Sequence, residues 1–285
     1  MIIFYSIVLF ILGSCIGSFL NVVILRTHEK KTLGGRSQCP YCKHELRPVD
    51  LIPILSYLLL RGKCRYCGHR LSPQYPLVEL LAAASFSLLF LVWGQTLTDK
   101  GLTPVLLLSF LFSLFSISVL IVVSVYDLRW GLIPDKIIFP ASIIAFIYQF
   151  LIFNFYSNIE NSIQILNFKL EILALHTLLL NLLTALGVGL FFLLLIVATR
   201  GRGMGGGDLK LSIFIALALG FPLTVVALLL AFLTGALASV ILLLSGKKGL
   251  KSKIPFGPFL ALGAVLAMLV GTTLWSLYLQ MLGFN

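Results

Sequence analysis

Two aspartates, Asp127 and Asp208, stand where apolar runs of the chain meet polar segments. Asp127 ends the run SISVLIVVSVYD, and Asp208 follows the glycine-rich stretch GMGGG. A carboxylate at the rim of a membrane segment is usually paired, capping a helix or functional. Two carboxylates held together can share a proton, so that one activates water while the other protonates a leaving group. The two positions therefore suggest an acid pair that hydrolyses a bond.

Each aspartate also has a structural alternative. Asp127 could pair with Arg129, although the C-terminal end of a helix disfavours a negative charge there. Asp208 could be the N-cap that ends a glycine-rich linker, but glycines also let a backbone approach a ligand closely. A helix N-terminus stabilises an anion, so we expect it to lower the pKa of Asp208 and to leave the shared proton mainly on Asp127.

Two further acids lie at helix ends. Asp135 follows Pro134 and precedes an expected helix, which is the position of an N-cap that accepts backbone N–H bonds. Glu79 stands near the start of another expected helix, and the sequence assigns it no role.

Four cysteines form the second group that could do chemistry. They occur as CPYC (Cys39, Cys42) and CRYC (Cys64, Cys67), with 21 residues between the pairs. Two such pairs are typical of a four-thiolate zinc site, and the alternative is two unlinked thiol pairs. Four thiolates leave no open coordination position, so the zinc is expected to be structural.

The surroundings of the cysteines favour a metal over disulfides. The segment 26–76 is expected to face the reducing cytoplasm, where disulfides are rare. A loop of this size also gains from a metal because it cannot bury much of a core. His44 and His69 lie beside the cysteines and could replace a ligand, but a surface role is favoured for both.

The elements that position these groups are membrane helices. Of 285 residues, 59% are apolar and 11% are charged, and the mean hydropathy is +1.07. Apolar runs near the roughly 20 residues needed to cross a bilayer recur along the chain. We predict an all-α polytopic membrane protein with about eight transmembrane helices, at 2–25, 77–93, 104–126, 137–153, 172–198, 209–220, 223–244 and 257–281.

Three parts follow from this pattern. Residues 1–25 form a permanent first transmembrane helix, since they lack the basic start of a cleavable signal peptide. Residues 26–76 form the cytoplasmic zinc-binding loop, and residues 77–285 form the transmembrane core. Pro222 should make the helix before it short, which leaves a re-entrant hairpin open as an alternative.

Basic residues orient the chain. Of the 21 lysines and arginines, 19 fall in 26–76, 127–136, 199–210 and 246–254. Basic loops favour the cytoplasm, so both termini are expected outside. Topology and attraction to anionic membrane lipid explain the net charge of +11, and no nucleic-acid partner is expected.

One face of the first helix is expected to pack closely on another helix. Gly13, Gly17 and Asn21 recur every four residues and therefore share that face. Small residues allow close helix contact in a membrane, and an asparagine can donate an interhelical hydrogen bond.

The motifs together resemble those of bacterial prepilin peptidases, the bifunctional leader peptidase/N-methyltransferases. The resemblance rests on G-x-G-D (Gly205, Gly207, Asp208) with Lys210, and it extends nearly from end to end through GSFLNVVILR, the paired CxxC loop, SPQYPLVELL, YDLRWGLIPD and PFGPFLALG.

The resemblance implies an aspartic membrane peptidase in which Asp127 and Asp208 are catalytic and the four cysteines bind zinc. It implies a bacterial inner or plasma membrane location with the active site facing the cytoplasm. The implied substrates are type IV prepilins or pseudopilins, cut after the glycine that ends a short basic leader. The new N-terminal residue would be methylated from S-adenosylmethionine, for which the sequence shows no donor-binding motif.

Two other functions compete with hydrolysis. A proton-coupled transporter would use the aspartates as a relay, and it would show inverted repeats with acids near the membrane midplane. The aspartates instead cluster at one expected face. A zinc-dependent membrane scaffold would leave the acids incidental.

Overall fold

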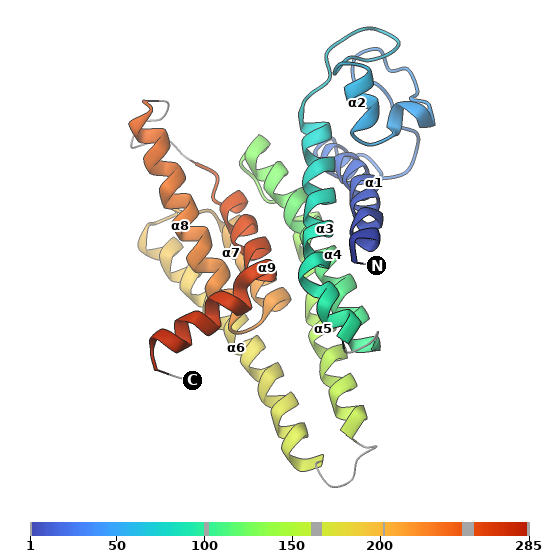
Figure 1. Ribbon diagram of the computed structural model, residues 1–285. Helices are drawn as coiled ribbons and strands as arrows, with labels where there is room; N and C mark the ends of the chain where they lie inside the picture. Colours follow the sequence, from blue (N-terminus) through green and yellow to red (C-terminus); the bar gives the residue numbers. More distant parts are fainter. Residues whose placement is uncertain (1, 100–102, 161–166, 202, 247–253, 284–285) are drawn as a thin grey trace. The chain divides into compact units, whose positions relative to one another are not determined.

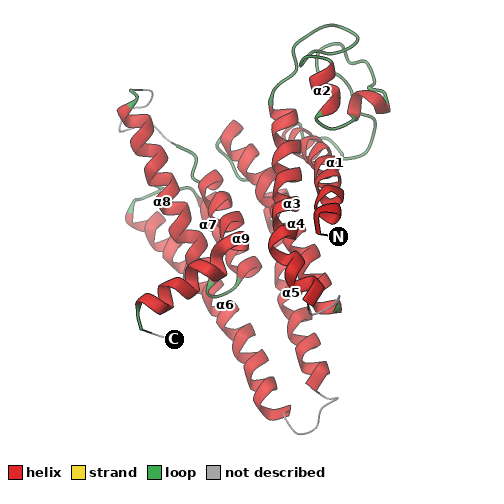
Figure 2. Cartoon of the chain, in the orientation of Figure 1, coloured by secondary structure: helices red, strands yellow, loops and turns green. Residues whose placement is uncertain are grey.

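We describe a computed structural model of the chain that covers residues 2–99, 103–160, 167–201, 203–246 and 254–283. These residues form helices and two isolated β-bridges, without an extended strand in the described ranges (Figure 2). The helices are α1 (Ile2–His28), η1 (Pro48–Leu51), α2 (Leu55–Leu59), α3 (Gln74–Asp99), α4 (Pro104–Trp130), α5 (Asp135–Glu160), α6 (Asn167–Ala198), α7 (Gly206–Leu219), α8 (Leu223–Leu244) and α9 (Gly257–Met281) (Figure 1).

The chain is a multi-pass membrane protein. In the described residues, seven helices are long and apolar enough to cross a bilayer: α1, α3, α4, α5, α6, α8 and α9. The remaining expected helix, α7, has 14 residues. Its length of about 21 Å is below the roughly 30 Å of a hydrocarbon core. The structure thus confirms the helical membrane fold, with α7 as the short helix expected before Pro222.

The chain divides into two compact units. The first comprises Met1–Leu102 and Ile117–Val125, and the second comprises Thr103–Ser116 and Tyr126–Asn285. Helix α4 contributes residues to both units. Of the 19 basic residues that orient the chain, Arg202 and the four lysines between 247 and 253 lie outside the described residues.

In the first unit, α1 packs along α3 through the face that the sequence predicted. A Cβ on Gly13 would come within 2.8 Å of the Ala82 carbonyl oxygen, and one on Gly17 within 2.6 Å of the Glu79 Cα. Asn21 Nδ2 donates to the Tyr75 carbonyl across the same interface at 3.1 Å. Both predictions for this face, close packing and an interhelical donor, are confirmed.

In the second unit, α7 lies among α5, α6, α8 and α9 and contacts all four. Leu211, Phe214 and Ile215 of α7 are almost completely buried. A helix that is apolar on all sides belongs in an interior, which explains why this short helix sits at the centre of the unit. Its N-terminus is the end that bears Asp208.

A buried polar network ends α7 within this unit. Gln149 Nε2 donates to the Leu217 carbonyl at 2.6 Å, and Asn181 Nδ2 donates to Gln149 Oε1 at 3.0 Å. Asn181 Oδ1 accepts the Phe221 N–H at 3.0 Å. Backbone groups freed at a helix end need such partners where water is scarce. The Asn181 side chain also contacts Gly220, which has a φ of 66° and no Cβ to obstruct the turn.

Candidate active site and metal centre

Asp127 lies in the last turn of α4, where Gly131 ends the helix in the left-handed conformation. Only 6% of the residue is exposed. Its Oδ2 accepts the Gly257 N–H from the start of α9 at 3.0 Å. A Cβ on Gly257 would lie 2.6 Å from that oxygen, so the contact requires glycine. The motif PFGPFLALG contains this glycine, but its role could not be inferred from the sequence.

Asp208 is the third residue of α7 instead of its N-cap, which is Gly205. The structural alternative, in which Asp208 is the N-cap, is therefore wrong, because Asp208 lies three residues after the N-cap. Asp208 Oδ2 accepts the Gly205 N–H at 3.4 Å. Gly207 packs closely against Ile133: a Cβ added to Gly207 would lie 3.1 Å from the Ile133 Cβ. Because Ile133 follows α4 closely, this contact brings the segment after Asp127 to the segment that bears Asp208.

The two aspartates influence each other electrostatically. Burial, together with the negative charge of Asp127, raises the pKa of Asp208 from 3.8 to about 6, while the Gly205 N–H opposes the rise. The expectation that the helix N-terminus lowers this pKa is wrong, because removal from water outweighs the helix end. At neutral pH Asp208 is still mainly ionised, and its pKa is close to the range that suits a general base.

Asp135 is the first residue of α5 and pairs with α7. Its Oδ1 accepts from Lys210 Nζ at 2.7 Å, and Pro134 supplies the carbonyl that receives the Ile138 N–H. The expected N-cap role of Asp135 is therefore wrong, and its exposed carboxylate instead forms an ion pair with Lys210. This pair ties the start of α5 to the first turn of α7, beside Asp208.

The four cysteines of the first unit come together. The Sγ atoms of Cys39, Cys42, Cys64 and Cys67 all lie within 4.8 Å of one another. Four sulfurs around a zinc ion at about 2.3 Å would be about 3.8 Å apart, close to the 4.0 Å between Cys39 Sγ and Cys67 Sγ. The cluster can therefore hold a metal ion, and its all-thiolate composition is compatible with structural zinc.

Each cysteine pair sits in the same kind of turn. Cys39 N–H donates to the His44 carbonyl at 3.0 Å, and Cys64 N–H donates to the His69 carbonyl at 2.9 Å. The residue after the second cysteine of each pair has a positive φ, and the glycine at that place in the second turn, Gly68, adopts it without strain. The two turns thus present their thiols in matching geometry.

The matching turns expose an internal repeat that sequence reasoning missed. CPYCKHELRP and CRYCGHRLSP share six of ten positions. In the folded loop each repeat contacts the other through a pair of rings tilted by 34°: Tyr41 packs against His69 with centroids 3.5 Å apart, and Tyr66 packs against His44 with centroids 3.7 Å apart. Both histidines therefore pack against the opposite tyrosine, outside the thiol cluster. Alignment of the two CxxC segments would have revealed the repeat.

The thiols also favour a cation. Burial opposes ionisation of Cys64, but the backbone N–H groups of Cys67 and Tyr66 and the neighbouring thiols lower its pKa from 9.0 to about 7. The His69 N–H lowers the pKa of Cys67, but burial and the neighbouring thiols outweigh it and raise that pKa to about 11. One thiolate is thus easily formed and further ones are resisted. A bound cation would remove that resistance.

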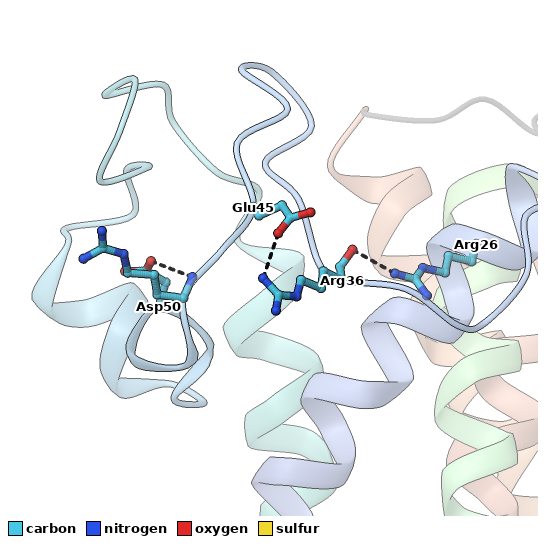
Figure 3. Close-up of polar contacts among 5 residues, drawn as sticks. Arg26, Arg36, Glu45 and Asp50 are labelled. Atoms are coloured by element: carbon cyan, nitrogen blue, oxygen red, sulfur yellow. Dashed lines mark hydrogen bonds and ion pairs between the residues drawn. The ribbon is translucent and has the colours of Figure 1, made fainter.

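Arginines fix the loop to the end of α1. The Arg26 guanidinium donates to the carbonyls of residues 33–36, including Gly35 at 3.0 Å and Arg36 at 3.2 Å. Arg36 in turn pairs with Glu45 at 3.0 Å (Figure 3). The first cysteine turn is therefore connected to the membrane helix by charged hydrogen bonds.

Comparison with known proteins shows the family of the chain. Residues 11–93 match the "Bacterial Peptidase A24 N-terminal domain", and residues 114–240 match the "Type IV leader peptidase family". A Bacillus subtilis (strain 168) protein named "Prepilin leader peptidase/N-methyltransferase" is 34% identical, over 96% of this chain and 98% of its own. The chain belongs to the type IV leader peptidase family. It is therefore a peptidase.

Other relatives agree over the full length. A Pseudomonas aeruginosa protein of the same name is 29% identical, over 96% of this chain and 93% of its own. A protein of that name from Aeromonas salmonicida (strain A449) is 31% identical, over 97% of this chain and 94% of its own. No solved structure matches the chain significantly. Membership in a peptidase family leaves the transporter and scaffold hypotheses without support.

Proposed function

We propose that this protein cleaves the short basic leader from type IV prepilins or pseudopilins by means of an aspartate pair. The observation that supports this most directly is the raised pKa of Asp208, which responds to the charge of Asp127 within the second unit. Both aspartates lie in the segment that matches the leader peptidase family. The curated relatives are named for prepilin processing, which gives the substrate class.

The proposed mechanism gives the two carboxylates different tasks. Asp208 is mainly ionised at neutral pH and removes a proton from the attacking water. The pair then shares that proton, and Asp127, whose Oδ2 accepts the Gly257 N–H, passes it to the leaving amine. Peptide hydrolysis requires such a base and acid together. Since close carboxylates titrate as a unit, the division describes a bias within the pair.

The second proposed activity is methylation of the newly exposed N-terminal residue, with S-adenosylmethionine as the methyl donor. Support comes from the relatives named "N-methyltransferase". The methyl transfer is proposed at the level of the activity alone, without a donor site. In the first unit, zinc bound by Cys39, Cys42, Cys64 and Cys67 would hold the loop in shape and would leave no position open for catalysis.

The proposed location is the bacterial inner or plasma membrane, with residues 26–76 and the aspartate pair facing the cytoplasm. The distribution of basic residues supports this orientation. In this arrangement 1–25 is the first span and 77–285 contains the peptidase core. The hydrophobic helix of a prepilin substrate would approach through the membrane lipid.

Cleavage of a synthetic prepilin peptide by purified full-length protein tests the proposal. Asp127→Asn and Asp208→Asn should each lower kcat/KM by at least about 10²-fold, because each removes one proton-transfer group. Glu29→Gln is the control, since that acid is half-exposed, pairs with Lys31 and lies in the first unit. Full cleavage by either of the first two variants would refute the mechanism.

A further inference from the structure

Exposed apolar residues gather in the part of the metal loop that contains η1 and α2. We name this group the leucine face, and it consists of six residues between 39% and 82% exposed: Val49, Leu51, Ile52, Leu55, Leu58 and Leu59. Scattered exposed apolar residues are ordinary, but a contiguous group marks an interaction surface. Here the group occupies η1, α2 and the turn between them.

The opposite side of α2 is fixed to the rest of the loop, which keeps the leucine face outward. Tyr57 OH donates to the Leu71 carbonyl at 3.4 Å. The Tyr57 ring also covers Gly62, where an added Cβ would lie 2.9 Å from the hydroxyl oxygen. Leu55, Leu58 and Leu59 follow helical spacing on the other side of this short helix.

A hydrogen bond sets the depth of α2 relative to α3. The Ile54 N–H donates to Glu79 Oε2 at 2.7 Å. Glu79 is only 7% exposed and lies within the candidate membrane span that begins at Gln74. Five residues of helix correspond to about 7.5 Å, so Glu79 lies about that far along the span, and its side chain holds the start of α2 close to this part of α3.

The lipid-facing side of α3 is exposed at the same level. Leu77, Leu80 and Leu81, on either side of Glu79 in sequence, are 55%, 47% and 52% exposed. In a membrane span such side chains face lipid. The start of α2 is therefore held beside the part of α3 whose exposed leucines would face lipid.

Charges around the leucine face suit an anionic lipid surface. Asp50 is the acid within the segment, and its side chain is only 4% exposed because it pairs with Arg65 at 2.6 Å. Tyr66 OH also donates to Asp50 at 2.9 Å. Arg47 and Arg61 are exposed at the two ends of the segment. Apolar residues flanked by arginines are typical of segments that lie in the membrane interface.

We propose that residues 48–60 lie in the membrane interface, with the leucine face inserted into the headgroup and acyl boundary of an anionic bilayer. Arg47 and Arg61 then reach lipid phosphates while their aliphatic stems stay apolar. The metal loop is thereby held against the bilayer surface as well as by its connections to α1 and α3. The inference rests on the membrane spans and is independent of peptidase activity.

Tryptophan fluorescence in lipid nanodiscs tests this with full-length, zinc-loaded protein. Leu55→Trp and Leu59→Trp are compared with Glu45→Trp, an exposed position on the first cysteine turn. Each signal is the increment over the unchanged chain, which has three tryptophans. With brominated acyl chains, the first two increments should be quenched about twofold or more, and the control little. Equal quenching at all three positions, with zinc retained, would overturn the proposal.

Lipid charge tests the arginines and separates lipid from a protein partner. Replacing phosphatidylcholine by phosphatidylglycerol should increase the quenching at Leu59→Trp. The double variant Arg47→Gln, Arg61→Gln should lose that increase. Equal quenching in both lipids would show that Arg47 and Arg61 do not bind lipid phosphates and would overturn that part of the proposal. A blue shift of Leu59→Trp that needs an added prepilin in place of lipid would identify a protein-docking surface and refute it.

Discussion

The metal loop and the aspartate pair differ in how far apart their parts lie in the chain. Cys39 and Cys67, at the extremes of the thiol cluster, are separated by 28 positions. Asp127 and its partner Gly257 are separated by 130 positions and come from different helices. A local site is specified by spacing and turn residues, whereas the aspartate pair depends on how helices distant in sequence pack. Disturbing one should therefore leave the other nearly intact.

The largest expected effect is on the metal. Cys39→Ser and Cys64→Ser should reduce the zinc content from about one ion per chain to a small fraction, because four thiolates complete the site. Elemental analysis of purified protein measures this. Cys15→Ser is the control, since that exposed thiol lies in α1 outside the cluster. Undiminished zinc in Cys64→Ser would show that the thiols do not form one site.

A packing change beside Asp127 should act only on catalysis. Gly257→Ala places a Cβ about 2.6 Å from Asp127 Oδ2 and must displace the carboxylate. Displacement by about 1 Å can cost roughly 10²-fold, so we expect a fall in kcat/KM of about 10- to 100-fold with zinc unchanged. Gly187→Ala, where a Cβ meets open space in α6, should retain activity. Normal activity in Gly257→Ala would make the close contact irrelevant.

The pH profile distinguishes the sites further. Above about pH 6 Asp208 is ionised and can act as a base, and below that value its protonated form accumulates. We therefore expect kcat/KM to fall about tenfold per unit on the acid side of pH 6. If activity instead fell only near pH 3.8, the ordinary pKa of an aspartate, neither burial nor Asp127 would be raising the pKa of Asp208.

The smallest expected effect is in the ring contacts of the metal loop. Tyr41→Leu removes the contact with His69 while all four thiols remain. Thermal unfolding should show a loss of about 0.5–1.5 kcal/mol, with zinc retained. Tyr66→Leu should cost more, because Tyr66 also donates to Asp50. Loss of zinc in Tyr41→Leu would mean that the rings help to assemble the metal site.

The local features were predictable from sequence. The apolar runs predicted the membrane helices, and the four-residue spacing of Gly13, Gly17 and Asn21 predicted the face that packs on α3. The spacing of the cysteines predicted the thiol cluster. In each case neighbouring residues along one element set the geometry.

The features missed by sequence reasoning depend on contacts between distant elements. Two contacts join helices that are distant in sequence: Gly257 with Asp127, and Asp135 with Lys210. Helical periodicity along one segment does not predict which other helix lies beside it. The direction of the Asp208 pKa was also wrong. The helix end was visible in the sequence, but the burial that outweighs it arises only when α7 is enclosed by other helices.

The central claim is that Asp127 and Asp208 act as one interacting pair, and infrared titration of their carboxyl bands tests it most directly. In Asp127→Asn the remaining Asp208 should titrate below the higher of the two steps seen in the unchanged protein, because the negative charge that raises its pKa is gone. Burial still acts, so its pKa should remain above the ordinary 3.8. An Asp208 titration that is identical with and without the Asp127 carboxylate would contradict the pair.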